Sequence, residues 1–206
     1  MDELRVAIAS EFDLFDGEAY RVLLELVLGV PVRRWAGDFR FFGDKHVAKM
    51  APSFLGAAER AGVGRALLAV DNDGGASRRP EHDATHTPIP DGEFDIEDDV
   101  SCRECWLEAA IPPAWRSPAR SCVVVPVQML ETWLLALRGD PLEPTPEQAN
   151  AYSRDVLKRR FFGRPQPPVE RRIELARVEL SRPDALDVLR ERPSFRRFEA
   201  RLSHWR

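Results

Sequence analysis

Residues 66–75 read ALLAVDNDGG, and this segment restricts the choice of fold more than any other part of the chain. It places a run of apolar residues before two aspartates that flank an asparagine, and two glycines follow. An uninterrupted apolar run of this length is typical of a strand in a parallel sheet that helices cover on both faces. The glycines allow a sharp turn after it. The segment therefore predicts an α/β fold with a buried sheet.

The two aspartates of this segment form a candidate metal site. Side chains alternate along a strand, so Asp71 and Asp73 project to the same side if the extended geometry continues through Asn72. Open α/β folds bind their ligands at the carboxyl ends of the strands. Neighbouring carboxylates repel each other, and a divalent cation such as Mg²⁺ or Mn²⁺ relieves that repulsion. The alternative is a polar loop with a turn.

Strand and helix patterns alternate through the first two thirds of the chain, and helical patterns separated by prolines follow. Expected strands fall at 4–9, 32–35, 66–70 and 122–125. Expected helices fall within 10–29, 45–61, 104–110, 126–139, 146–162, 168–180, 183–190 and 194–202. This order predicts a Rossmann-like α/β core over residues 1–140, with a mostly parallel central sheet flanked by helices, and a helical C-terminal extension over 146–206 that packs on the core.

Further carboxylates follow other elements of the expected sheet. Glu11 follows the first strand, and Glu131 lies in the first turns of a later helix. Carboxylates without an evident serine or cysteine triad suit metal-assisted phosphoryl transfer better than acyl transfer. Asp13, Asp16 and Glu18 lie close to Glu11 and compete with it for this role. The alternative for Glu131 is a charge that favours the helix dipole.

With a glutamate after the first strand and an apolar strand that ends in Asp-x-Asp-Gly, the chain resembles the Toprim domain of topoisomerases, primases and OLD-type nucleases. The segments VPVQMLETWLLA and RPSFRRFEARL are similar, more specifically, to small stand-alone Toprim proteins related to RloB. The similarity covers most of the chain, in order. It departs from the family where Toprim proteins usually have glycine after the first glutamate, since Phe12 stands there.

The resemblance implies a metal-dependent nuclease that cleaves phosphodiester bonds in DNA or RNA. It assigns Mg²⁺ or Mn²⁺ binding and catalysis to Glu11, Asp71 and Asp73, and Glu131 matches the glutamate of the family's Glu-x-Trp helix. Such relatives are commonly encoded beside an ATPase and associated with phage defence. The resemblance therefore implies a partner ATPase of the AAA or ABC type and a role in antiviral defence.

Histidines and cysteines gather in the polar segment between the third strand and the next helix, about residues 74–105. They form two pairs, His82-x3-His86 and Cys102-x2-Cys105. Both spacings match tetrahedral Zn²⁺ sites, and a structural zinc ion would order a loop with little apolar content. The alternatives are solvated histidines with small half-buried cysteines, and a redox Cys-x-x-Cys pair.

Charge divides the chain into an acidic body and a basic C-terminal part. The formal net charge is −4, but residues 154–206 hold 15 Lys or Arg against 8 Asp or Glu. Lys158, Arg159 and Arg160 begin this part, and we expect them to bind nucleic-acid phosphates. The alternative is that arginines decorate solvated helix faces. The second function hypothesis is a non-catalytic regulatory or binding subunit with the same fold.

The N-terminus and the three cysteines predict the compartment. MDELRVAIAS begins with acidic residues and lacks the basic region of a signal peptide, and three cysteines do not make a disulfide framework. No apolar run reaches the roughly 18–20 residues that span a membrane. We therefore expect a cytoplasmic protein without a membrane partner.

Overall fold

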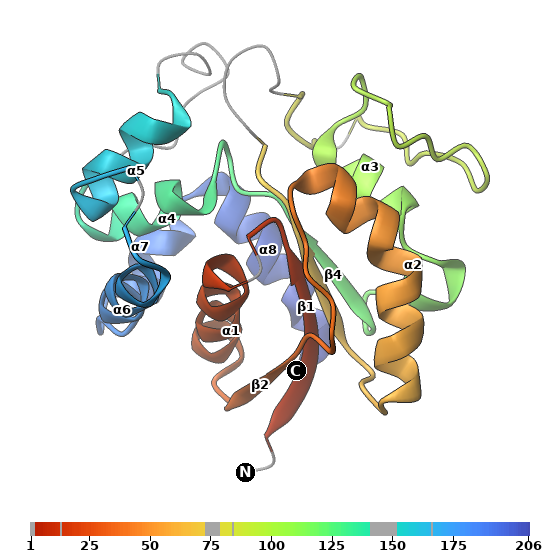
Figure 1. Cartoon of the computed structure of the whole chain (residues 1–206), viewed down its shortest axis with the longest axis horizontal. Helices are drawn as coiled ribbons and strands as arrows, with labels where there is room; N and C mark the ends of the chain where they lie inside the picture. Colours follow the sequence, from red (N-terminus) through yellow and green to blue (C-terminus); the bar gives the residue numbers. More distant parts are fainter. Residues whose placement is uncertain (1–2, 13, 73–78, 84, 141–151, 166) are drawn as a thin grey trace.

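The computed structural model describes residues 3–12, 14–72, 79–83, 85–140, 152–165 and 167–206. Its strands and helices follow one another in the order shown in Figure 1. The elements are β1 (Leu4–Ser10), α1 (Phe15–Leu28), β2 (Val32–Trp35), α2 (Asp44–Arg60), β3 (Ala66–Ala69), α3 (Arg103–Ala109), η2 (Pro113–Trp115), β4 (Ser121–Val124), α4 (Leu130–Leu137), α5 (Arg154–Phe162), α6 (Val169–Leu180), α7 (Ala185–Arg190), α8 (Pro193–Leu202) and η4 (Ser203–Trp205).

Over the described residues, four strands form one sheet in the order β2-β1-β3-β4, and every pairing is parallel. Ser10 pairs with Ala69, and Ala69 with Val124, so these three strands end level with one another. Their carboxyl ends lie at the top of Figure 1. The prediction of an α/β fold with a buried parallel sheet is confirmed, including the short strand at 32–35.

Helices cover both faces of the sheet (Figure 1). On β3, Leu67 packs toward the face with α1 and the C-terminal helices, whereas Leu68 packs toward the face with α2 and α3. Both side chains are fully buried, and each contributes about 1.5–3 kcal/mol relative to exposure. This two-sided burial explains why the sequence of β3 is continuously apolar rather than alternating.

The segments at 126–137 and 193–202 pack against each other. The Trp133 indole of α4 meets the Phe195 ring of α8 edge-on, with centroids 5.2 Å apart, and its Nε1 donates to Ser194 Oγ at 2.9 Å. Phe198 stacks on the same indole. The aromatic residues of the ETW and RPSFRRF segments therefore form one buried cluster on the α1 side of the sheet.

Several helices begin later than the start of the segments in which they are expected, and α1, for example, begins at Phe15 within the segment 10–29. The helix expected within 126–139 begins at Leu130, because Gln128 has φ 68°, a left-handed conformation that helix residues do not adopt. In the described chain the helix expected at 146–162 begins at Arg154, where Ser153 Oγ accepts the Val156 N–H. Residues 141–151 lie outside the described part. No helix among the described residues is long and apolar enough to cross a membrane.

Candidate active site

The pairing of β1 with β3 brings Glu11 and Asp71 together at the carboxyl end of the sheet. The backbone N–H of Asp71 donates to Glu11 Oε1 at 2.7 Å. Asp71 in turn accepts, through Oδ1, the backbone N–H of Leu130 at 3.3 Å, so its side chain reaches the first residue of α4. These hydrogen bonds join β1, β3 and α4 at one point.

Three further carboxylates line the same pocket, which has a volume of about 450 Å³: Asp16, Glu131 and the exposed Asp155 in the first turn of α5. Asp16 lies in the first turn of α1, and its Oδ2 accepts the Phe12 N–H at 3.1 Å. Glu131 lies in the first turn of α4 and is 2% exposed. The four buried acids of the pocket come from the ends of two strands and the beginnings of two helices: Glu11, Asp16, Asp71 and Glu131.

Burial and mutual repulsion make ionisation of these acids costly. The pKa of Asp16 is raised to about 8, first by burial and then by the charge of Glu131. The pKa of Asp71 is raised well above its usual value by burial and then by Glu11. Burial also raises the pKa of Glu131, although the positive charges of Lys158 and Arg172 partly oppose it. The buried acids therefore favour their protonated forms in the folded protein.

Basic side chains approach the acids from the C-terminal helices. Arg154 Nη2 lies 3.5 Å from Glu11 Oε2 and 3.6 Å from Asp71 Oδ2. Arg172 Nη2 lies 3.6 Å from Glu131 Oε1, and its guanidinium stacks on the Phe15 ring at 4.1 Å from the centroid. The pocket is therefore lined by both acidic and basic side chains, and the basic ones, Arg154 and Arg172, can pair with an anionic group.

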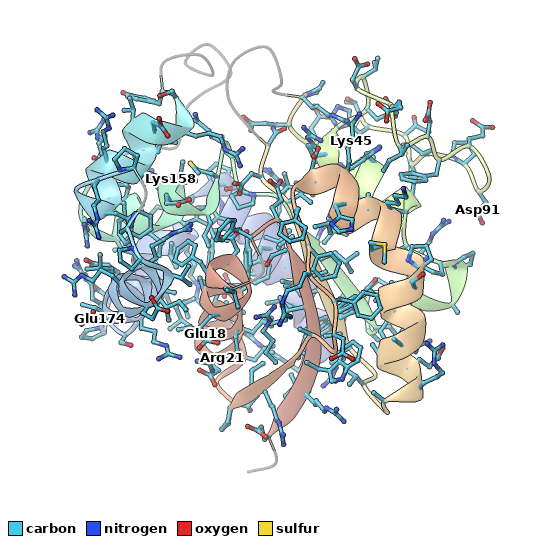
Figure 2. All side chains as sticks on the ribbon, in the orientation of Figure 1. Glu18, Arg21, Lys45, Asp91, Lys158 and Glu174 are labelled. Atoms are coloured by element: carbon cyan, nitrogen blue, oxygen red, sulfur yellow. The ribbon has the colours of Figure 1, made fainter. Side chains whose placement is uncertain are left out.

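The three basic residues that are predicted to bind phosphates, Lys158, Arg159 and Arg160, have different surroundings in the structure. Lys158, labelled on α5 in Figure 2, lines the pocket. Arg159 is exposed, and Arg160 pairs with Asp140 at 2.7 Å. Their role in nucleic-acid binding stays a prediction, but Lys158 is the member of the triplet that reaches the acids.

The sequence predicts four site residues. Glu11, Asp71 and Glu131 line the pocket, and Asp73 lies outside the described residues. The sequence offers Asp16 as an alternative to Glu11, and in the structure both residues line the pocket. It does not predict Arg154 and Arg172. Spacing along α5 and α6 gives no signal for them, because many other arginines share these helices.

A separate group of potential metal ligands lies in the segment after β3. One ligand atom from each of its four residues lies within 4.8 Å of all the others. The cluster could hold a metal ion such as zinc, and it consists of His82, His86, Cys102 and Cys105. Within the described part of the chain, no comparable convergence is found among the carboxylates.

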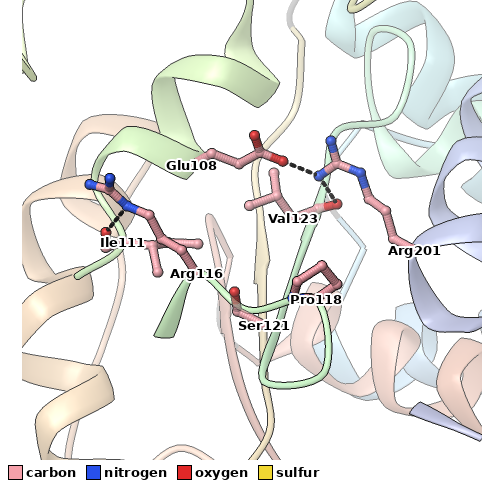
Figure 3. Close-up of a pocket in the computed structure, with 7 residues that line it drawn as sticks. All are labelled: Glu108, Ile111, Arg116, Pro118, Ser121, Val123 and Arg201. Atoms are coloured by element: carbon pink, nitrogen blue, oxygen red, sulfur yellow. Dashed lines mark hydrogen bonds and ion pairs between the residues drawn. The ribbon is translucent and has the colours of Figure 1, made fainter. Parts of the chain in front are cut away.

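A second cavity, of about 290 Å³, lies between α3, β4 and α8 (Figure 3). Arg201, one of the two arginines that line this cavity, pairs with Glu108 at 2.8 Å and with Glu104 at 2.9 Å. Arg201 also donates to the Val123 carbonyl at 3.1 Å, as Figure 3 shows. This cavity therefore lacks the clustered, charge-repelled acids of the candidate active site.

Comparisons of the chain with protein-family models, curated proteins and solved structures found no match.

Proposed function

We propose that this chain is a metal-dependent nuclease of the Toprim type, which cleaves phosphodiester bonds in DNA or RNA at the pocket between β1, β3 and α4. One observation carries the proposal. Glu11 and Asp71 are 60 residues apart in the sequence, yet the side chain of one accepts the backbone N–H of the other in a pocket that also holds Asp16 and Glu131.

Carboxylate oxygens are the ligand type that a hard divalent cation takes, although the described carboxylates do not converge on one point as the His and Cys cluster does. All four acids offer oxygen ligands, which Mg²⁺ and Mn²⁺ prefer. The guanidinium of Arg154 lies between the carboxylates of Glu11 and Asp71, which supports the view that a positive charge belongs at this point. We assign the ion to Glu11, Asp71 and Asp73, with Asp73 placed by its sequence position alone. When bound, the ion would stabilise charge on the phosphoryl oxygens.

The other residues of the pocket have roles that follow from their charge. Arg154, Lys158 and Arg172 would bind the phosphates on either side of the scissile bond. Asp16 is poised to hold a proton near neutral pH, because its pKa is raised to about 8, so it could protonate the leaving oxygen. Glu131, almost fully buried beside Arg172, would hold that guanidinium in place.

A partner ATPase and a role in phage defence follow from the resemblance to RloB-like Toprim proteins, and they remain part of the proposal. A regulatory subunit without catalysis is the second candidate. Phe12, 49% exposed at the pocket where the family has glycine, favours it, since a bulky side chain there narrows access to Glu11.

Incubation of the purified chain with supercoiled plasmid, linear DNA and RNA, in Mg²⁺ or Mn²⁺, tests the enzyme hypothesis, with and without a candidate partner ATPase. Asp71→Asn and Glu11→Gln should abolish cleavage, whereas Asp187→Asn, on an exposed residue of α7, should not. If neither the parent nor the parent with the ATPase cuts any substrate, the catalytic proposal is wrong and the regulatory one replaces it.

A further inference from the structure

Four potential zinc ligands from two separate segments meet near the start of α3. His82 Nδ1 lies 3.5 Å from Cys102 Sγ and 3.4 Å from Cys105 Sγ. His86 completes the group, with its ring centroid 5.6 Å from that of His82. Both cysteines are buried, and both histidines are half-buried.

The spacing of these atoms matches a tetrahedral zinc centre. With Zn–S near 2.3 Å and Zn–N near 2.0–2.1 Å, a sulfur and a nitrogen on the same ion lie roughly 3.5 Å apart. The two sulfur–nitrogen distances in the structure, 3.5 and 3.4 Å, agree with this value. The approach of both sulfurs to the same nitrogen is the arrangement that a shared ion produces.

The backbone around Cys102 also positions its sulfur. The N–H of Cys105 donates to Cys102 Sγ at 3.3 Å, across the turn that begins α3. This hydrogen bond fixes the position of Cys102 Sγ at the start of α3, on the side where His82 approaches it.

We propose that His82, His86, Cys102 and Cys105 bind a structural Zn²⁺ ion. Four protein ligands close the tetrahedral shell and leave no position for water or substrate, which distinguishes a structural centre from a catalytic one. Soft sulfur ligands select zinc over Mg²⁺ and Mn²⁺.

The zinc centre is linked to the segment that follows Asp71. Asn72 Nδ2 donates to the Arg79 carbonyl at 3.1 Å, and the Arg79 N–H donates to Asn72 Oδ1 at 3.2 Å. The Arg79 guanidinium donates to the Ser101 carbonyl at 3.3 Å and lies 4.8 Å from the Trp106 ring centroid. Arg79 thus joins Asn72 to the residues on either side of the Cys-x-x-Cys turn, and the ion would hold both ends of this connection in place.

Metal analysis of full-length protein purified without chelators tests the site directly. We expect about one zinc per chain, as one closed tetrahedral site requires. Cys102→Ser and His82→Ala should each lose the bound zinc. Cys122→Ala and His204→Ala are matched controls outside the cluster, one buried and one exposed, and they should keep it.

Replacement of zinc by Co²⁺ provides a second readout that needs no activity. Tetrahedral cobalt with two thiolates should give visible d–d absorption and a thiolate charge-transfer band, and both should disappear in Cys105→Ser. Amide hydrogen exchange at Asn72 and Arg79 should accelerate when the ion is removed, because the connection to the Cys-x-x-Cys turn loosens.

Three results would overturn this inference: parent protein without zinc, zinc that Cys102→Ser retains, or a Cys102–Cys105 disulfide in freshly purified protein, the last of which would favour a redox role. Because zinc content is measured without substrate, these outcomes are independent of whether the chain is a nuclease.

Discussion

Glu11 Oε1 accepts the backbone N–H of Asp71 at 2.7 Å, so the acid that follows β1 is held against the first residue beyond the apolar run of β3. This contact is possible because β1 and β3 are neighbours in register, with Ser10 opposite Ala69. Glu11 therefore keeps its second oxygen on the side of the pocket, where Arg154 approaches it.

Loss of one carboxylate should reduce cleavage far more than stability. Asp71→Asn and Asp73→Ala should each lower the cleavage rate by about 100-fold or more, since even residues that support metal ligands affect activity by about 10–100-fold. The melting temperature of the metal-free variants should stay equal or rise, because carboxylate repulsion falls. Steady-state cleavage assays and calorimetry with EDTA check both parts. Variants that cut as fast as the parent would contradict the assignment.

Stability of the metal-free protein should fall as the pH rises from about 4 to about 8. The pKa of Asp16 is raised to about 8, whereas an unfolded aspartate titrates near 3.9, so the folded state holds the extra proton across this window. One such carboxyl lowers the free energy of unfolding by at most about 1.4 kcal/mol per pH unit. Urea unfolding in EDTA at several pH values measures the slope.

Asp16→Asn should make that slope shallower without removing it, because the pKa values of Asp71 and Glu131 are raised as well. Asp187→Asn, on an exposed carboxylate, should leave the slope as in the parent. An identical slope in Asp16→Asn and the parent would show that Asp16 is ionised in the folded protein.

The basic residues of α5 should differ in their effect on nucleic-acid binding. Lys158→Ala should weaken binding and reduce the slope of log K against log salt by about 1, as expected for one lost phosphate contact. Arg159→Ala should have a smaller effect, because Arg159 is exposed and is not among the residues that line the pocket. Fluorescence anisotropy across a salt series compares the two. Equal losses would indicate a diffuse basic surface instead.

Arg154→Gln should strengthen divalent-metal binding, because its guanidinium lies between the carboxylates of Glu11 and Asp71, which we assign to the ion. Isothermal titration with Mn²⁺ measures this change, and Arg159→Gln serves as the control for loss of a positive charge on the same helix. Weaker binding in Arg154→Gln than in the control would contradict the assignment of the ion to this pair.

The aromatic cluster of α4 and α8 should stabilise the fold without taking part in chemistry. Trp133→Ala should lower the free energy of unfolding by about 3–5 kcal/mol, the range for large buried aromatic side chains. Val178→Ala, on a 60% exposed side chain of α6, should change it by less than about 0.5 kcal/mol. Urea unfolding monitored by far-UV circular dichroism checks both values.

The local order of residues was enough to predict the parallel sheet and most helices, because burial on both faces demands a continuous apolar strand and burial on one face demands helical spacing. It also identified the His-x3-His and Cys-x2-Cys pairs, since metal ligation constrains spacing within each pair. The boundary of α4 was missed because the left-handed conformation of Gln128 depends on tertiary contacts, which include a hydrogen bond from its side chain to the Tyr152 carbonyl.

The composition of the pocket was decided by tertiary packing. Asp16 lies beside Glu11 because α1 turns back over the sheet, and its raised pKa results from burial and from Glu131, 115 positions along the chain. Arg154 and Arg172 reach the acids because α5 packs on α4, and α6 on α1. The sequence does not distinguish one arginine of these helices from another. Charge interactions depend on distance in space and on the local dielectric, so the tertiary structure determines which arginines pair with a carboxylate.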